Sequence, residues 1–174
     1  MREIYARASK LQLAAFDVDG VLTDGTLYYL PSGEELKAFN VLDGHGMKML
    51  QESGVRLAII SSRSSPCVAE RARNLGIDLL YQGVGDKLVT FNALLDHCGV
   101  AAERCSFIGD DVVDLPVMRC CGLAASVPDA PAAVRRQAHY ITHARGGHGA
   151  VRELCELVMQ AQGTLSAQLS AYVA

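Results

Sequence analysis

Short apolar runs alternate with helical patterns along most of the chain, and this alternation restricts the fold more than any other feature. Six runs are predicted to be strands: residues 11–18, 55–62, 77–82, 105–111, 123–127 and 139–143. Helical patterns separate them: residues 44–54, 65–76, 87–99, 113–122, 131–138 and 149–163. Buried strands that alternate with helices indicate a parallel sheet covered on both faces. We therefore expect a Rossmann-like three-layer α/β/α sandwich with a mostly parallel sheet.

Length and charge narrow the class of protein further. A chain of 174 residues that is 50% hydrophobic is typical of one domain with a sizeable core, and we expect a single domain over residues 1–174. A β-hairpin is predicted at about 26–41 and a C-terminal tail at about 164–174. The net charge of −3 without a basic patch gives no indication of nucleic-acid binding. Neither a signal-peptide pattern nor a membrane span is recognised, so we expect a cytosolic protein without membrane contact.

Polar side chains follow four of the predicted strands, at the point where each strand ends. Asp17 and Asp19 come after the first strand, and Ser61 ends the second. Lys87 follows the third strand and Asp110 the fourth. Because ligands bind at the carboxyl ends of the strands in open parallel sheets, these side chains are predicted to share one site.

The residue types at these positions favour phosphoryl transfer. Three carboxylates that converge, from Asp17, Asp19 and Asp110, need a hard cation with oxygen ligands, and Mg²⁺ fits best. A carboxylate can attack phosphorus to form an aspartyl phosphate, and a second carboxylate can protonate the leaving oxygen and later activate water. Ser61 and Lys87 would supply a hydroxyl and a fixed positive charge for the phosphoryl oxygens.

The four motifs, in this order, resemble those of the haloacid dehalogenase superfamily of phosphatases. "DVDGVLTD" is similar to the first motif, which implies Asp17 as nucleophile and Asp19 as general acid and base. Ser61 and Lys87 match the second and third motifs, and "GDDVVD" at 109–114 matches the fourth. The catalytic set implied is Asp17, Asp19, Ser61 and Lys87, the metal ligands are Asp17, Asp19 and Asp110, and Asp111 and Asp114 are candidate supporting residues. A calcium-binding loop is a poorer reading of "DVDG", because Val21 stands where such a loop needs an oxygen ligand.

The spacing of the motifs leaves no room for the cap domain that closes the site in many members of this superfamily. The predicted hairpin and one helix occupy the stretch between the first two motifs, and only a short stretch separates the last two. A dry site strengthens electrostatic interactions, so closure is expected from another subunit. An isolated two-stranded ribbon is marginally stable, and the hairpin is the candidate contact. The alternative is that the hairpin folds over its own sheet.

Longer segments narrow the resemblance to one family. "GEELKAFNVLDGHGMKML", "LGIDLLYQG", "FIGDDVVDLPVM" and "GGHGAVRELCELVMQAQG" are similar to the capless phosphatases that act on 3-deoxy-D-manno-octulosonate 8-phosphate (KDO 8-phosphate), over Leu11 to Gly163. The resemblance implies a cytosolic, Mg²⁺-dependent homotetramer that makes free KDO for Gram-negative lipopolysaccharide. It also implies that the hairpins form an intersubunit barrel and that a neighbour's C-terminal segment covers the site.

The same resemblance implies a set of residues that bind the sugar acid phosphate. The substrate-binding set is Asp19, Asn40, Asp43, Gly44, Lys48, Arg63, Arg71 and Lys87. Arg152 is a candidate supporting residue that either reaches a neighbour's site or simply lies on the last helix. Arg63 and Arg71 offer forked donors suited to anionic oxygens. Two positions depart from the family's usual pattern. Ser62 replaces a glycine in the second motif, and His148 replaces a basic residue in the glycine-rich segment.

Two other functions remain open at the level of sequence. A phosphatase for a related sugar acid phosphate, of the acylneuraminate 9-phosphate type, would use the same catalytic residues. A non-catalytic oligomerisation module, like the domains fused to some sugar-acid cytidylyltransferases, would need no catalytic residues at all. The presence of Asp17, Asp19, Lys87 and Asp110 argues against the module.

Overall fold

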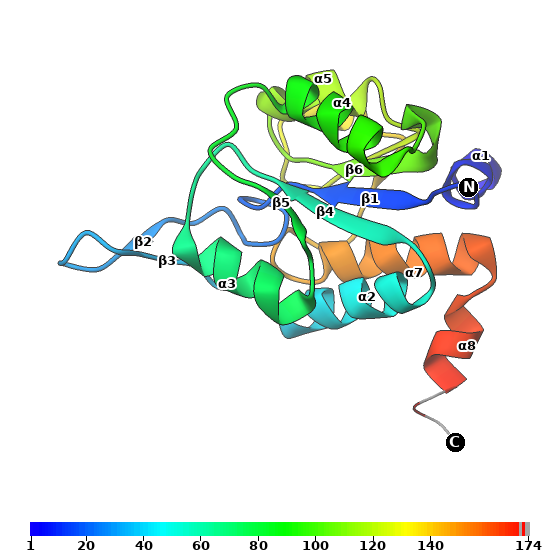
Figure 1. The fold of residues 1–174 in the computed structure, drawn as a ribbon, viewed down its shortest axis with the longest axis horizontal. Coiled ribbons are helices and arrows are strands. Elements are labelled where there is room, and N and C mark those ends of the chain that lie inside the picture. Colours follow the sequence, from blue (N-terminus) through cyan, green and yellow to red (C-terminus); the bar gives the residue numbers. More distant parts are fainter. Residues whose placement is uncertain (171, 173–174) are drawn as a thin grey trace.

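The computed structural model describes residues 1–170 and 172, and a six-stranded sheet forms its centre (Figure 1). The strands are β1 (Leu13–Phe16), β4 (Arg56–Ile60), β5 (Leu79–Tyr81), β6 (Cys105–Ile108), β7 (Leu123–Ser126) and β8 (Tyr140–Ile141). They lie in the order β5-β4-β1-β6-β7-β8, and every neighbouring pair is parallel. Each strand falls inside a predicted apolar run and is shorter than that run.

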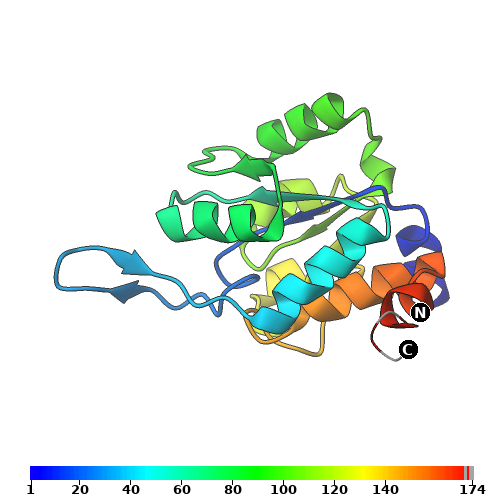
Figure 2. The ribbon, with the colours of Figure 1, turned by 60° about the horizontal axis from the view of Figure 1, so that its bottom comes forward.

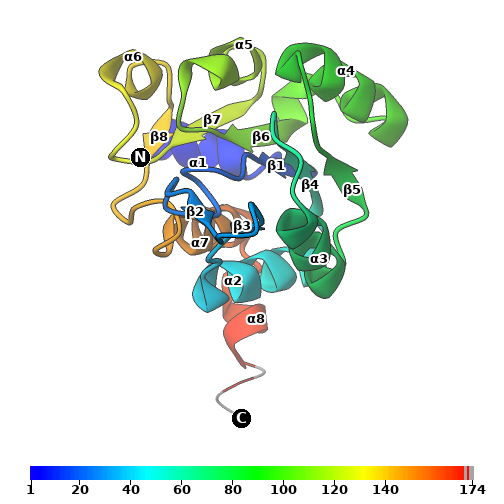
Figure 3. The ribbon, with the colours of Figure 1, turned by 90° about the vertical axis from the view of Figure 1, so that its left-hand side faces the viewer.

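Helices cover both faces of this sheet, which confirms the predicted three-layer sandwich (Figure 3). One face carries α2 (Val41–Glu52), α3 (Pro66–Leu75) and α7 (Ala150–Gln162), with α1 (Arg2–Ala8) packed against α7. The other face carries α4 (Lys87–Cys98), α5 (Leu115–Met118) and α6 (Ala132–Arg135). Two short 3₁₀ helices, η1 (Ala102–Arg104) and η2 (Val112–Asp114), lie before and after β6.

The structure differs from the sequence prediction at several element ends. Helix α2 begins three residues earlier than expected, because the Asn40 side chain accepts a hydrogen bond from the Leu42 N–H (2.7 Å) and caps the helix. Part of the predicted tail is helical, as α8 (Leu165–Ser170), whereas its residues 171, 173 and 174 lie outside the described part. Among the described residues, no helix has the length and apolar character needed to cross a membrane.

Apolar packing fixes the two strands from which the site is built. All four residues of β1 and all four of β6 are buried. The ring of Phe91 in α4 packs edge to face with that of Phe107 in β6, with centroids 6.5 Å apart. Burial of each large apolar side chain contributes on the order of 2 kcal/mol, so the ends of β1 and β6 are held firmly.

The predicted hairpin is present and projects away from the sheet (Figure 2). Strands β2 (Tyr28–Tyr29) and β3 (Glu35–Leu36) pair antiparallel, and the Leu30 N–H donates to the Glu34 carbonyl (2.9 Å) across the turn. The large apolar side chains exposed along it are Leu27, Tyr28, Tyr29, Leu30 and Leu36. In a single copy of the chain this ribbon therefore presents apolar surface to water.

Candidate active site

The site lies at β1, on whose two sides the later strands of the sheet are added: β4 and β5 on one side, and then β6, β7 and β8 on the other. Strand β1 pairs with β4 on one side and with β6 on the other, and the remaining strands continue outward from these two. The loops that leave β1 and β6 separate at this point and form the crevice in which open α/β sheets bind ligands. The Asp17 N–H still donates to the Ile108 carbonyl (3.0 Å), so the residues that follow the two strands start side by side.

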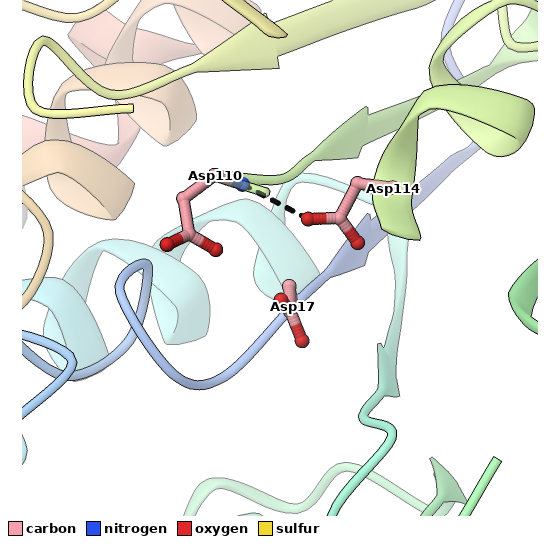
Figure 4. Close-up of side chains that lie close together, drawn as sticks. All are labelled: Asp17, Asp110 and Asp114. Carbon is pink, nitrogen blue, oxygen red and sulfur yellow. Dashed lines mark hydrogen bonds between the residues drawn. The ribbon is translucent and has the colours of Figure 1, made fainter. Parts of the chain in front are cut away.

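Three carboxylates meet in this crevice (Figure 4). Asp17, Asp110 and Asp114 each offer an oxygen, and these oxygens all lie within 4.8 Å of one another. The third member, Asp114, is completely buried and its carboxylate accepts the N–H groups of Asp110 (3.0 Å) and Asp111 (3.1 Å). Asp114 therefore fixes the loop after β6, while Asp17 and Asp110 face the crevice.

One buried ammonium group lies against the cluster. The Nζ atom of Lys87 is 2.8 Å from Asp17 Oδ1 and 2.7 Å from Asp114 Oδ1, and Lys87 is only 3% exposed. It is the first residue of α4, whose cap is the side chain of Asp86. One positive charge thus faces three carboxylates. Within the described residues, no hydrogen bond is donated to the carboxylate of Asp110.

The electrostatics of the cluster indicate an excess of negative charge. Burial, together with the nearby Asp114, raises the pKa of Asp17 to about 6 even though Lys87 opposes this shift. Burial and the charges of Asp17 and Asp114 raise the pKa of Asp110 to about 7. Burial alone would lower the pKa of Lys87, but Asp17 and Asp114 outweigh it and the pKa is raised. A divalent cation would relieve this repulsion, and an all-oxygen donor set suits Mg²⁺.

Asp19 does not join the carboxylate cluster as the sequence prediction supposed. Its carboxylate forms an ion pair with Lys37 of the hairpin and lies 3.8 Å from the Nε atom of Arg63. This side chain therefore points to Lys37 at the base of the hairpin and to Arg63 in the loop after β4. The convergence expected of Asp17, Asp19 and Asp110 is therefore found for Asp17 and Asp110, and the carboxylate of Asp114 takes the third position.

A cavity of about 240 Å³ nevertheless brings most of the predicted catalytic residues together. Its lining consists of Asp17, Asp19, Gly25, Ser61, Ser62, Arg63, Lys87, Asp110, Asp111 and Val113. Ser61 is buried, and its hydroxyl accepts the N–H of Arg63 (3.2 Å). A nucleophile, a second carboxylate, a hydroxyl and a cation thus face one space.

Three of the predicted substrate-binding residues line a different cavity. Gly44, Lys48 and Arg71 lie around a space of about 340 Å³, which shares no lining residue with the Asp17 cavity. The guanidinium of Arg71 donates to the Asn40 carbonyl (2.9 Å), and a Cβ atom on Gly44 would lie 2.1 Å from its Nη2 atom. Gly44 therefore makes room for this guanidinium.

Two other predicted residues have side chains that serve the fold. Asp43 is 1% exposed, and its carboxylate accepts the N–H groups of Gly149 (3.2 Å) and Arg152 (2.7 Å) at the start of α7. It faces neither cavity, because these backbone donors hold it inside the molecule. The guanidinium of Arg152 pairs with Glu156 one turn further along α7 (2.6 Å).

Comparisons with known proteins decide the family. A model of the haloacid dehalogenase-like hydrolases matches residues 26–122. The chain belongs to this family. The 3-deoxy-D-manno-octulosonate 8-phosphate phosphatase KdsC of Salmonella typhi is 45% identical over 93% of this chain and 86% of its own length.

Solved structures of this hydrolase family agree with the fold. The Moraxella catarrhalis 3-deoxy-D-manno-octulosonate 8-phosphate phosphatase, in complex with a magnesium ion, a phosphate ion and KDO, has a TM-score of 0.97. It is 44% identical, and the match covers 99% of both chains. A probable yrbI family phosphatase from Pseudomonas syringae has a TM-score of 0.98 at 49% identity, covering 100% of this chain and 99% of its own. The resemblance to phosphatases of this hydrolase family, drawn from the sequence motifs, is confirmed.

Sequence reasoning missed two residues at the mouth of the hydrolase site. Lys37, whose side chain is 2% exposed, contacts both Asp19 and Glu35, and Glu35 in turn contacts Arg63 (3.1 Å). The segment "EELKAF" could have indicated this pair, because alternation along a strand puts Glu35 and Lys37 on one face and Leu36 on the other. The base of the hairpin is thus joined to Asp19 by alternating charges.

The two departures from the family pattern fall in different places. Ser62 is exposed and lines the Asp17 cavity. His148 lines a neighbouring space of about 360 Å³ with Asp24, Asp110 and Arg145. The histidine therefore lies beside the carboxylate cluster and outside the cavity that contains Asp17.

Proposed function

We propose that this chain is a Mg²⁺-dependent phosphatase that hydrolyses KDO 8-phosphate to KDO and inorganic phosphate, a step toward lipopolysaccharide. The observation that carries the proposal is the cluster of Asp17, Asp110, Asp114 and Lys87, of which all but the half-buried Asp110 are buried. This cluster lies in a chain that is 44–45% identical, over nearly its whole length, to phosphatases named for this substrate.

The residues present fit a magnesium ion. Asp17 and Asp110 would hold it, since both face the crevice and both have raised pKa values that reflect uncompensated charge. Asp114 supports them from behind through the N–H of Asp110. When bound, the ion would neutralise charge on the phosphoryl oxygens. The predicted role of Asp19 as a metal ligand has no support from its carboxylate, which points to Lys37 and Arg63.

The proposed chemistry has two steps. In the first, an oxygen of Asp17 attacks phosphorus, the bond from phosphorus to the sugar oxygen breaks, and Asp19 gives its proton to that oxygen. In the second, Asp19 takes a proton from a water molecule that attacks phosphorus, and the bond to Asp17 breaks to release phosphate. Lys87 and Ser61 would hold the phosphoryl oxygens in line with the attack.

The sugar acid is proposed to span a subunit boundary. Arg63 lines the Asp17 cavity, whereas Lys48, Gly44 and Arg71 line a cavity that shares no residue with it. A second copy that presents its Arg71 cavity to the Asp17 cavity would supply cations for the carboxylate and hydroxyls of the sugar. The exposed apolar hairpin supports the homotetramer that the family resemblance implies. A cytosolic location belongs to the same proposal and rests on that resemblance.

The two alternatives receive less support. A phosphatase for an acylneuraminate 9-phosphate would use the same cluster, but the similar proteins from Salmonella typhi and Moraxella catarrhalis are named for KDO 8-phosphate. A non-catalytic module would have no need for a buried lysine between two carboxylates, whose burial is costly.

Release of inorganic phosphate from a panel of sugar acid phosphates tests the proposal directly. We expect KDO 8-phosphate to be hydrolysed in Mg²⁺, with loss of activity after chelation and recovery when Mg²⁺ is restored. A higher kcat/KM for an acylneuraminate 9-phosphate would assign the alternative substrate. No Mg²⁺-dependent phosphate release from any member would leave the non-catalytic module.

Stabilisation of the protein by Mg²⁺ is expected to depend on pH. The folded-state pKa values of Asp17 and Asp110 lie above the ordinary value of 3.8. The metal-free fold therefore loses stability as pH rises from about 4 to 7, because the unfolded chain gives up these protons first. Mg²⁺ binds the ionised carboxylates, so its effect on Tm should be small at pH 5 and large at pH 8. Thermal unfolding with and without Mg²⁺ measures this, and an equal Mg²⁺ shift at both pH values would contradict it.

A charge on the hairpin is expected to give smaller assemblies with little KDO 8-phosphate activity. Leu27 is 43% exposed, so Leu27→Asp should not disturb the core. Val89→Asp, at an apolar position of α4 that is 64% exposed, is the matched control. Light scattering and phosphate-release kinetics test both variants. Full activity of a Leu27→Asp monomer would rule out a site completed between subunits.

A further inference from the structure

A glycine-rich loop, residues 146–149, lies directly against the loop that follows β1. The Gly147 N–H donates to the Val21 carbonyl (2.9 Å). A Cβ atom on Gly146 would lie 1.8 Å from the Gly20 carbonyl oxygen, closer than any real contact. The two backbones therefore touch with no side chain between them. A displacement of one loop must be taken up by the other.

Gly20 transmits this contact to the carboxylate cluster. A Cβ atom on Gly20 would lie 2.0 Å from Asp110 Oδ2, so the carboxylate of Asp110 rests on this glycine. Gly20 has a φ of +83° and lies three positions after Asp17. The position of the loop after β1 thus affects both Asp17 and Asp110.

Two residues hold the glycine-rich loop from the other side: Asn40, which caps α2, and Asp43, which lies in the first turn of that helix. Asp43 accepts the N–H of Gly149 (3.2 Å) and of Arg152 (2.7 Å). The Nδ2 group of Asn40 donates to the Gly147 carbonyl (3.2 Å), while its Oδ1 atom caps α2. A buried carboxylate is costly unless donors satisfy it, which ties Asp43 to this arrangement.

We propose that Asp43 and Asn40 are positioning residues, which press the glycine-rich loop onto Gly20 and so keep Asp17 and Asp110 at the separation that one Mg²⁺ ion needs. The proposal rests on the proposed function for the identity of the ion. The order of contact is Asp43 and Asn40, then residues 146–149, then Gly20, then Asp110. Residues that orient metal ligands from behind typically change metal affinity 10- to 100-fold when altered.

Asn40→Asp is the sharpest variant. Aspartate caps helices as well as asparagine does, so α2 keeps its start. The Nδ2 donor, however, becomes a carboxylate oxygen that faces the Gly147 carbonyl and repels it. Asn40→Ser is the matched control, because it keeps a capping residue and introduces no repulsion. Mg²⁺ affinity is measured by isothermal titration calorimetry with the metal alone, so contact of Asn40 with substrate cannot affect the result.

Three further variants separate positioning from stability. Asp43→Asn removes one of the two oxygen atoms that accept N–H groups from the start of α7. Gly146→Ala forces the glycine-rich loop away from the loop that follows β1. Glu153→Gln is the control for α7, because the Glu153 carboxylate accepts the N–H groups of His143 (2.9 Å) and Ala144 (3.0 Å). Only the backbone N–H of Glu153 contacts the glycine-rich loop, at the Gly149 carbonyl (2.9 Å), and the substitution keeps that bond. Thermal unfolding reports stability for each, and kcat and KM are measured at saturating Mg²⁺.

We expect Asn40→Asp, Asp43→Asn and Gly146→Ala to weaken Mg²⁺ binding about tenfold or more. Asn40→Ser should weaken it less than Asn40→Asp, and Glu153→Gln should lower Tm with unchanged Mg²⁺ affinity. Wild-type Mg²⁺ affinity in Asn40→Asp would overturn the proposal, even if Asp43→Asn or Gly146→Ala fails to fold. If Glu153→Gln weakened Mg²⁺ binding as much as Asp43→Asn does, Asp43 would only cap α7 and would have no positioning role. Because the metal is titrated without substrate, a failed phosphatase assay would leave this result standing.

Discussion

Asp17→Asn is expected to lower turnover roughly 10⁴-fold or more while the fold stays intact, because an amide cannot attack phosphorus. The side chain keeps its shape, and the backbone N–H of residue 17 still donates to the Ile108 carbonyl. Burial and the neighbouring Asp114 raise the pKa of Asp17 and outweigh the opposing Lys87, so removal of the charge relieves a net penalty. The metal-free variant should therefore unfold at a Tm no lower than that of the wild type. Phosphate-release kinetics and thermal unfolding measure the two effects.

Asp19→Asn provides the informative comparison. Its carboxylate lies with Lys37 and Arg63, outside the cluster, so Mg²⁺ affinity should be retained. Turnover should fall about 10²- to 10⁴-fold, because the proton donor and acceptor is lost. Asp96→Asn, an exposed change on α4, should alter neither quantity. Wild-type turnover in Asp17→Asn would exclude the covalent mechanism, and loss of Mg²⁺ binding in Asp19→Asn would contradict the separation of the two carboxylates.

The architecture could be predicted because its signals are local. Each strand of the sheet is an apolar run bounded by turn residues, and "LAAF" is buried at all four positions as a central parallel strand requires. Gly76 and Gly99, with φ values of +70° and +62°, end α3 and α4 close to where the sequence places their ends. The convergence of Asp17, Ser61, Lys87 and Asp110 follows from topology alone, because parallel strands end at one edge.

The direction of individual side chains could not be predicted in the same way. Asp114 is the third carboxylate of the cluster in place of the expected Asp19. Asp19 instead pairs with Lys37, a residue of the hairpin. Asp43 resembles a ligand in sequence, yet the N-terminus of α7, more than one hundred residues later, takes its carboxylate. Both outcomes depend on long-range partners. A motif fixes which residues are near the site but not which donor each carboxylate finds.

Lys87→Met is expected to abolish turnover and to destabilise the protein more than any other single change at the site. Its ammonium group is the cation shared by two carboxylates that are nearly inaccessible to water. Removal of one partner from a buried ion pair costs about 3–5 kcal/mol, because the remaining charges stay buried without compensation. For a chain of this size that corresponds to a fall in Tm of about 6–20 °C. Methionine keeps most of the volume, so lost packing adds little.

Mg²⁺ should recover part of the stability of Lys87→Met, because it replaces one positive charge near Asp17, but it should not recover turnover. The phosphoryl oxygens would still lack the fixed cation that holds them during attack. Lys10→Met, an exposed position far from the site, is the control and should shift Tm very little. Thermal unfolding with and without Mg²⁺, together with phosphate release, distinguishes the two effects. A Lys87→Met variant with wild-type Tm would mean that Asp17 and Asp114 tolerate burial without this lysine, and the electrostatic account of the cluster would then be wrong.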